Sequence, residues 1–107
     1  MTDSIPSDVE LRDNLDQSRF ELWISDSTAT PTMVGITDYV SHDGTVAIPH
    51  TEIDPSRGGR GYGSTMVRST LDILRERGLQ VIPQCPFVAD FIDRNPEYLD
   101  LVANGRP

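Results

Sequence analysis

The residues best suited by type and spacing to bind a ligand form the run RGGRGYGS at positions 57–64. A strand-like run ends just before it near Ile53, and a helix-like run begins at Ser64. Glycines let the backbone curl closely around a ligand, and a helix start presents unpaired N–H groups and partial positive charge. With Arg57 and Arg60, these features predict a site for an anionic group such as a phosphate or pyrophosphate. The glycines alone are equally compatible with a tight turn.

A second group of candidates comes just before this run. His50 and Glu52 are two residues apart in a strand-like segment, so their side chains share a face if the strand is regular. Histidine has an ordinary pKa of about 6.5, which suits a general base. Glu52 would then either orient His50 or attract a cationic amine. The alternative is a histidine bonded to backbone and a solvated glutamate. Pro49 predicts a sheet edge, a bulge or a break in pairing.

Cys85 is the single cysteine, which excludes an intrachain disulfide framework. It would accept an acyl group as a nucleophile if the neighbouring helix start and arginines activate its thiol. We favour the alternative that it is a small residue lining a ligand, because a lone buried cysteine is commonly a packing residue. Tyr98 is either an acid or part of the core. The spacing of His50, Glu52 and Cys85 matches no recurrent metal site, so none is expected.

Length and charge limit the class of protein. The 107 residues suit one domain, which we place at residues 18–103 after a polar N-terminal segment at residues 1–17. The net charge of −8 argues against a nucleic-acid binder. Residues 57–77 nevertheless carry a local charge of +3, a basic island that fits an anionic cofactor, although acidic surfaces also serve solubility alone. The acidic N-terminus and the lack of a long apolar run favour a cytoplasmic location without membrane association.

Hydrophobic periodicity predicts an α/β (α+β) domain. An Asp43-Gly44 hairpin turn joins two of three strands in an antiparallel meander, and Gly78 ends a helix that crosses over to a parallel strand. A proline opens the last helix, in which Phe87 and Phe91 are expected to point inward. The predicted elements are strands at 19–25, 33–40 and 45–53, a helix at 64–77, a strand at 79–83, a helix at 86–94 and a helical turn or two at 96–102.

Two blocks of the sequence resemble a known family. HTEIDPSRGGRGYGSTMV at 50–67 resembles motif A of the GCN5-related N-acetyltransferases, the GNAT superfamily. PQCPFVADFIDRNPEY at 83–98 resembles a small single-domain branch of it, described as YjdJ-type or GNAT-like. The similarity covers roughly residues 14–103. It implies a minimal GNAT fold, acetyl-CoA as the cosubstrate and an amine as the acceptor.

The resemblance also implies roles for particular residues. Backbone N–H groups from Gly59 through Ser64 would bind the pyrophosphate of the cofactor. Thr51 and Ile53 would pair through their backbones with the pantetheine arm, where the acetyl carbonyl is polarised. The implied cofactor-binding residues are Thr51, Ile53, Gly59, Arg60, Gly61, Tyr62, Gly63, Ser64 and Cys85, beside the catalytic candidates Cys85, His50 and Glu52.

Two positions depart from the family pattern. A tyrosine that protonates the leaving thiolate in many relatives corresponds by spacing to Ile92, and a glutamate base of some relatives corresponds to about Ala47. Two hypotheses therefore stand. The protein is an acetyl-CoA-dependent N-acetyltransferase for a small-molecule or protein amine, or a non-catalytic CoA-binding module that acts as a sensor or partner-binding protein. His50 and Cys85 favour the enzyme, and either form would be a monomer or a homodimer.

Overall fold

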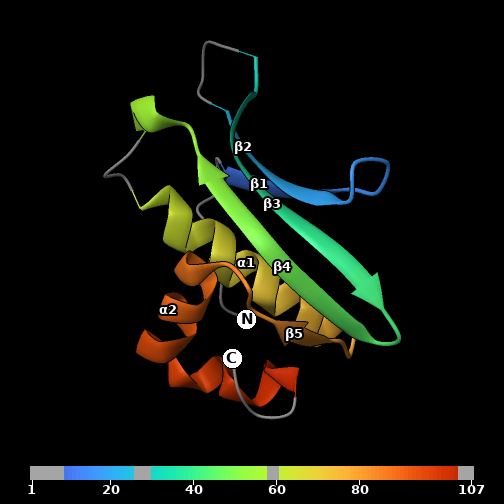
Figure 1. The fold of residues 1–107 in the computed structure, drawn as a ribbon. Coiled ribbons are helices and arrows are strands. Elements are labelled where there is room, and N and C mark those ends of the chain that lie inside the picture. The colour runs from blue at the N-terminus through green and yellow to red at the C-terminus, as the bar shows by residue number, and fades with distance from the viewer. Residues whose placement is uncertain (1–8, 26–29, 58–60, 104–107) are drawn as a thin grey trace.

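The computed structural model describes residues 9–25, 30–57 and 61–103, which form a five-stranded sheet with the helices packed on one face (Figure 1). The predicted α/β fold is confirmed, including its crossover helix and parallel strand. The elements are β1 (Val9–Asn14), β2 (Arg19–Ile24), β3 (Thr32–His42), β4 (Thr45–Ile53), the 3-10 helix η1 (Pro55–Arg57), α1 (Tyr62–Glu76), β5 (Gln80–Ile82), α2 (Pro86–Arg94) and the 3-10 helix η2 (Pro96–Leu101).

The strands follow their chain order across the sheet, from β1 to β5. The first four are antiparallel, and β5 joins β4 in parallel after the crossover through α1. The meander therefore has one strand more than the three predicted, because β1 pairs with β2 along its whole length. Its core-facing residues Val9 and Leu11 alternate with the exposed, charged Glu10 and the partly exposed Arg12, so little in this segment distinguishes a strand from a polar tail.

The turn between β3 and β4 follows the prediction. Asp43 and Gly44 have φ angles of 50° and 80°. Positive φ at both central residues is the geometry that matches the right-handed twist of the two strands in a tight hairpin. His42 beside the turn is exposed.

The core lies between the inner face of the sheet and the helices. In α1, Val67, Leu71 and Leu74 recur at helical spacing and are buried against the sheet. Each such side chain stabilises the fold by roughly 1.5–3 kcal/mol when it is removed from water. A larger core cluster joins Phe20, Val46, Ile48, Val67, Leu71, Leu74, Val81, Cys85, Val88, Phe91, Ile92, Tyr98, Leu101 and Val102, and a smaller one joins Val9, Leu22, Val34 and Met66.

A β-bulge interrupts β4 at Pro49. Ile48 and Pro49 together lie opposite the single residue Tyr39 of β3. A proline suits this position because it has no N–H to contribute to the ladder. The regular pairs on either side of the bulge are Asp38 with His50 and Val40 with Ala47.

The bulge decides which way the end of β4 faces. In an uninterrupted strand with a side-chain period of two, His50 and Glu52 would lie on the same face as Val46 and Ile48. The extra residue reverses the alternation. Val46 and Ile48 face the core, whereas His50 and Glu52 project from the opposite, helix-free face, hereafter the outer face.

Candidate functional site

Strands β4 and β5 part after three pairs of residues. Their parallel pairing runs from Thr45 to Ala47 of β4, and the N–H of Cys85 then donates to the carbonyl oxygen of Ile48 at 2.8 Å. Within the described part of the chain, no strand pairs with residues 50–53 of β4 on the β5 side. The backbone N–H and C=O groups on this side, hereafter the open edge, are available to an extended ligand.

The start of α1 lies beyond the end of β4 and has no side-chain cap. Gly61 has a φ of 78°, and the helix begins at Tyr62, two residues earlier than predicted. The N–H of Thr65 makes a helical bond to the carbonyl oxygen of Gly61 at 3.0 Å, and the N–H groups of Tyr62, Gly63 and Ser64 lie in the turn before it. These are the described N–H groups of the helix start at which the sequence predicts an anion site. Gly59 and Arg60 lie outside the described residues.

Gly63 serves a different purpose from the one predicted for the loop glycines. It lies inside α1, where a Cβ atom would come within 2.8 Å of the Phe87 ring and 3.7 Å of Ile53. The missing side chain therefore lets the end of the open edge, the start of α1 and the start of α2 meet. The prediction that Phe87 points inward is wrong, because the ring is 45% exposed and lies off the buried stripe of α2.

The structure brings His50 and Glu52 together. Nε2 of His50 lies 3.1 Å from Oε1 of Glu52, with both side chains more than half exposed. An ionised carboxylate only accepts hydrogen bonds, so the pair places the histidine proton on Nε2 and leaves Nδ1 free to accept a proton. An exposed pair of this kind contributes little to stability, about 0–1 kcal/mol. The contact places Glu52 where it could orient His50, one of the interpretations that the sequence left open.

The structure places Cys85 and Thr51 on the other face of the sheet from His50 and Glu52. Cys85 is 5% exposed and belongs to the core cluster on the inner face, whereas His50 projects from the outer face. Thr51 also points inward, with its hydroxyl 3.4 Å from that of Thr37. Among the described residues, no hydrogen bond links the side chain of Cys85 to His50 or Glu52. This environment suits Cys85 as a packing residue beside the open edge.

Tyr98 belongs to a structural network between α1 and η2. Its hydroxyl donates to Asp72 at 2.7 Å and accepts from Arg68 at 3.3 Å. Burial raises the pKa of Tyr98, and the bond to Asp72 raises it further. A phenol held in this way is poorly placed to donate a proton elsewhere. Ile92, at the position of the family tyrosine, is buried in the core.

The arginines of the predicted basic island point in different directions. Arg68 donates to Asn95, Arg75 donates to Asp100 at 2.6 Å and Arg77 donates to Asp13 at 2.8 Å. Helical geometry carries these three side chains toward η2 and β1, where each has its own partner. Arg60, which also contributes to the predicted island, lies outside the described residues.

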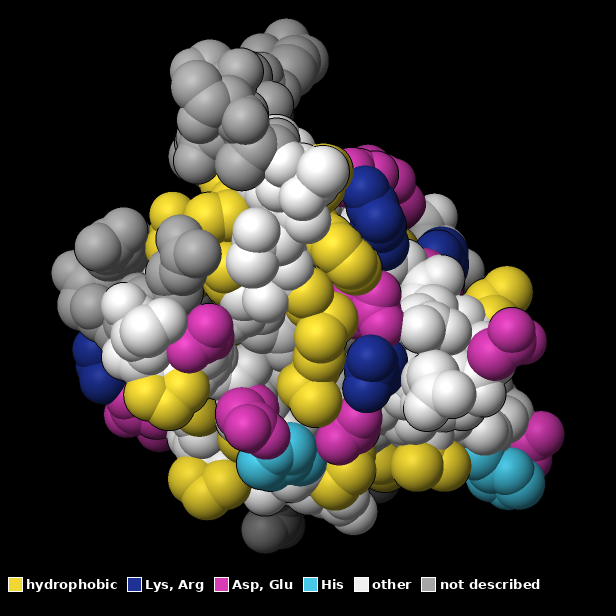
Figure 2. All heavy atoms as spheres, turned by 90° about the horizontal axis from the view of Figure 1, so that it is seen from above, with side chains coloured by type: hydrophobic (Ala, Val, Ile, Leu, Met, Phe, Trp, Pro, Cys, Tyr) yellow, Lys and Arg dark blue, Asp and Glu magenta, His cyan; other side chains and the backbone are white. Residues whose placement is uncertain are grey.

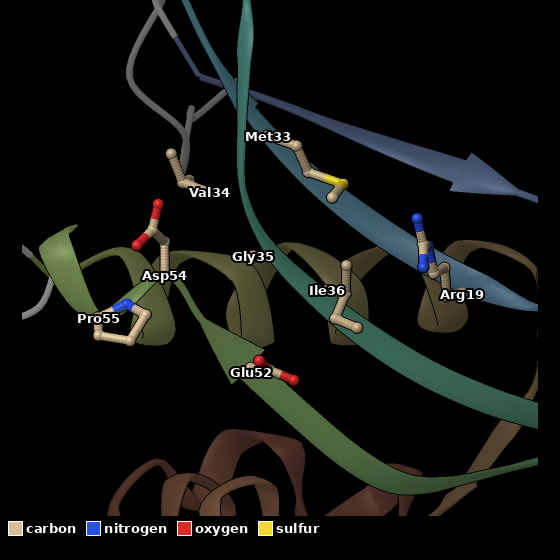
Figure 3. A pocket seen from close by; sticks show the side chains of 8 residues that line it. All are labelled: Arg19, Met33, Val34, Gly35, Ile36, Glu52, Asp54 and Pro55. Carbon is tan, nitrogen blue, oxygen red and sulfur yellow. The ribbon is translucent and has the colours of Figure 1, made fainter.

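A pocket of about 310 Å³ opens on the outer face beside Glu52 (Figure 3). Met33 and Ile36 of β3 are among the residues that line it, with Arg19 at one side and Asp54 at another. No sequence pattern predicted this pocket. Met33 and Ile36 point outward from β3, but their facing depends on register shifts between β2 and β3 and between β3 and β4, which the sequence does not reveal.

No described helix is long and apolar enough to cross a membrane. In the same part of the chain, no group of three or more histidine, cysteine, aspartate or glutamate residues is arranged to hold a metal ion.

Strand β4 separates from the parallel strand β5, and a helix with Gly61 at its N-cap begins next to this opening. This arrangement is typical of acyltransferases with the GNAT fold. The chain belongs to the GCN5-related N-acetyl-transferase family, whose sequence profile matches residues 19–101. The fold is similar to the solution NMR structure of a GCN5-like protein from Staphylococcus aureus. The TM-score is 0.64 at 22% sequence identity, over 91% of this chain and 90% of the other. No curated protein sequence matches significantly.

Proposed function

We propose that the protein transfers the acetyl group of acetyl-CoA to a primary amine. The observation that carries this proposal is the open edge of β4 next to the uncapped start of α1. Acetyl-CoA has two parts that fit these features. The amide-containing pantetheine arm would pair with the backbones of Thr51 and Ile53, and the pyrophosphate would accept from N–H groups between Gly59 and Ser64. Arg60 would add positive charge at the phosphates.

The outer-face pair would then handle the amine proton. An ammonium group must lose a proton before its nitrogen can attack, and Nδ1 of His50 would accept it while Glu52 holds the ring. The nitrogen then bonds to the thioester carbonyl carbon and the C–S bond breaks. The second proton of the attacking nitrogen passes to the departing thiolate, so CoA leaves as the free thiol. Cys85 would line the cofactor arm, since its own backbone N–H is already bonded to Ile48.

The missing family residues limit the rate without abolishing this chemistry. Holding two reactants in an aligned pair lowers the barrier by as much as about 7–11 kcal/mol. A general acid or base adds about 10²–10⁴-fold. This chain has Ile92 where many relatives have a tyrosine, and Ala47 near the position of a family glutamate. Most of the catalytic effect would therefore come from substrate positioning and from His50.

One observation favours the second candidate function, a CoA-binding module without catalysis. Ile92 is 1% exposed and belongs to the core, so this position contributes neither a proton nor a contact with ligand. The two functions differ in turnover and agree in cofactor binding. Release of free thiol from acetyl-CoA in the presence of an amine mixture separates them.

Calorimetric titration with acetyl-CoA, CoA and ATP tests the cofactor. We expect micromolar binding of acetyl-CoA and CoA, with little heat from ATP. Gly61→Val should abolish binding, because a branched side chain would stand where the phosphates approach. Gly44→Val is the matched control, since Gly44 also has positive φ with open space around it and lies in the hairpin turn. Equal loss in both variants, or no binding by the natural protein, would refute the pyrophosphate site.

A further inference from the structure

We propose that the outer-face pocket binds the acceptor and selects a small primary amine attached to an apolar body. This inference rests on the proposed function, because it names the substrate class for the same transfer site. It goes further in assigning a pocket, a floor and a charge to the acceptor side. The observations that carry it are the position of the pocket, its apolar floor and the hydrogen bonds of the charged side chains that line it, which are Arg19, Glu52 and Asp54.

The pocket lies close to the open edge of β4. Glu52 lies between Thr51 and Ile53, whose backbone groups face the open edge, and its side chain lines the pocket (Figure 3). The place where an acceptor would enter is therefore one residue along β4 from the backbone groups that would hold the thioester arm. Both α-helices, α1 and α2, pack against the inner face of the sheet, so among the described residues neither covers β4 on the outer face.

The floor of the pocket is apolar. Ile36 lies opposite Glu52 in the sheet, and Met33 is 36% exposed on the same strand. Viewed onto the outer face, hydrophobic side chains gather in a band that acidic and basic side chains border (Figure 2). An apolar floor favours a hydrocarbon or aromatic body by about 0.8 kcal/mol for each methylene removed from water. It disfavours a polyamine, which would need a carboxylate beneath each of its charges.

Arg19 and Glu52, which both line the pocket, differ in their hydrogen-bond partners. Nε of Arg19 donates to Glu21 at 2.9 Å, and Glu21 also accepts from Asn14 and Trp23. The bond from Asn14 is the largest contribution that lowers the pKa of Glu21, so this carboxylate stays ionised beside Arg19. The partner of Glu52 is a histidine, which leaves the negative charge of Glu52 uncompensated whenever His50 is neutral. The pocket therefore attracts a cation at its Glu52 end.

The volume limits the size of the acceptor. About 310 Å³ is at the lower end of the range of roughly 300–1,000 Å³ for small-molecule sites. A compact arylalkyl or alkyl amine fills such a space, with its ammonium group at Glu52 and its body over Ile36. After loss of its proton to His50, the same nitrogen lies next to the open edge, where the carbon–nitrogen bond would form.

The test measures amine binding directly, by calorimetry and by backbone NMR shifts, on free and CoA-saturated protein. The probes are 2-phenylethylamine, ethanolamine, 2-phenylethanol, spermidine and a short peptide with a free N-terminal amine. We expect 2-phenylethylamine to bind at least about tenfold more tightly than ethanolamine or 2-phenylethanol, because each lacks one of the two recognised parts. Tighter binding of spermidine or of the peptide would overturn the assignment.

Two variants and a control locate the binding. Ile36→Ser should weaken 2-phenylethylamine about tenfold by making the floor polar, and Glu52→Gln should weaken it similarly by removing the charge. Val40→Ser is the matched control, because Val40 lies on the same strand and face but outside this pocket, with 60% of its surface exposed. No change in Ile36→Ser, or an equal change in Val40→Ser, would refute the pocket.

The two proposals fail separately. If acetyl-CoA does not bind but 2-phenylethylamine binds with the expected variant pattern, the pocket stands and the transferase proposal falls. If acetyl-CoA binds and is turned over with amines that ignore Ile36→Ser, the transferase proposal stands and the pocket falls.

Discussion

The two halves of β4 differ more than their continuous sequence suggests. Thr45 to Ala47 pair with strands on both sides, and Val46 and Ile48 point into the core at 1% exposure. Residues 50–53 pair with β3 alone and direct two ionisable side chains outward. One strand therefore combines a stabilising half with a half left open for chemistry, and the bulge at Pro49 separates them.

This difference teaches that the site depends on incomplete pairing. A fully paired β4 would satisfy its backbone within the sheet and offer nothing to an extended ligand. The open half is tolerable because the other half and the helices carry the core. If this division holds, substitutions in the open half should change activity and substitutions in the other half should change stability.

Removing the base should produce the largest effect. We expect His50→Ala to lower kcat about 10²–10⁴-fold, because proton transfer to Nδ1 is lost. The free energy of unfolding should change by less than about 0.5 kcal/mol, since the side chain is exposed. His42→Ala is the matched control, as His42 forms a similar exposed pair with Asp43 at 3.2 Å. Steady-state kinetics and urea unfolding measure both quantities, and equal kcat values for the two variants would remove His50 from the mechanism.

Truncating the core half should affect stability instead. We expect Ile48→Ala to lower the free energy of unfolding by about 2–5 kcal/mol, because it leaves a cavity under the sheet. Ile53→Ala, in the open half, should cost less, since Ile53 is only partly buried. Urea unfolding of both variants provides the measurement. A larger loss in Ile53→Ala would contradict the division of β4 into a stabilising and an open half.

Crowding the meeting point of the two helices should have a smaller effect. In Gly63→Ala the new Cβ would displace the Phe87 ring, whose outer end is exposed and can move. Helix propensity gains up to about 1 kcal/mol, so the net change in unfolding free energy should lie within about 1 kcal/mol. In a Phe87→Ala background the same substitution should stabilise the protein. Destabilisation there would show that the close contact is not what requires glycine at this position.

The smallest effect concerns Tyr39, which lies opposite the bulge. Burial, reinforced by its 2.6 Å hydrogen bond to Asp13, raises the pKa of Tyr39 to about 12. A folded-state pKa above the ordinary 10 means that the neutral phenol contributes stability below pH 10, which is lost as the pH rises through about 12. Ultraviolet titration of Asp13→Asn should show a lower midpoint for Tyr39. An unchanged midpoint would contradict the role of Asp13.

Much of the fold was predictable from local patterns. The helix α1 and the Asp43-Gly44 turn could be predicted directly, because helical periodicity and positive φ depend on residues close together in the sequence. β1 was not predicted as a definite strand, since a half-charged edge strand resembles a polar tail. Phe87 was misplaced because a short helix contains too few apolar positions to define its buried face.

The candidate site was predictable in its residues but not in their arrangement. The pairing of His50 with Glu52 follows from their spacing, yet the face they occupy depends on where Pro49 places the bulge. The helix part of the predicted basic island shows a related limit of sequence reasoning. Closeness along a helix is not closeness in space, and Arg68, Arg75 and Arg77 each find a different acidic or polar partner.

The open edge also bears on how the protein behaves between turnovers. An unpaired strand edge is a template on which another chain can add a strand, and natural proteins protect such edges with prolines and charges. Pro49 and the outward Glu52 provide that protection here. A bound cofactor would complete it by occupying the same backbone groups. We therefore expect the ligand-free protein to be the form prone to self-association, so that solubility on storage should follow the supply of CoA.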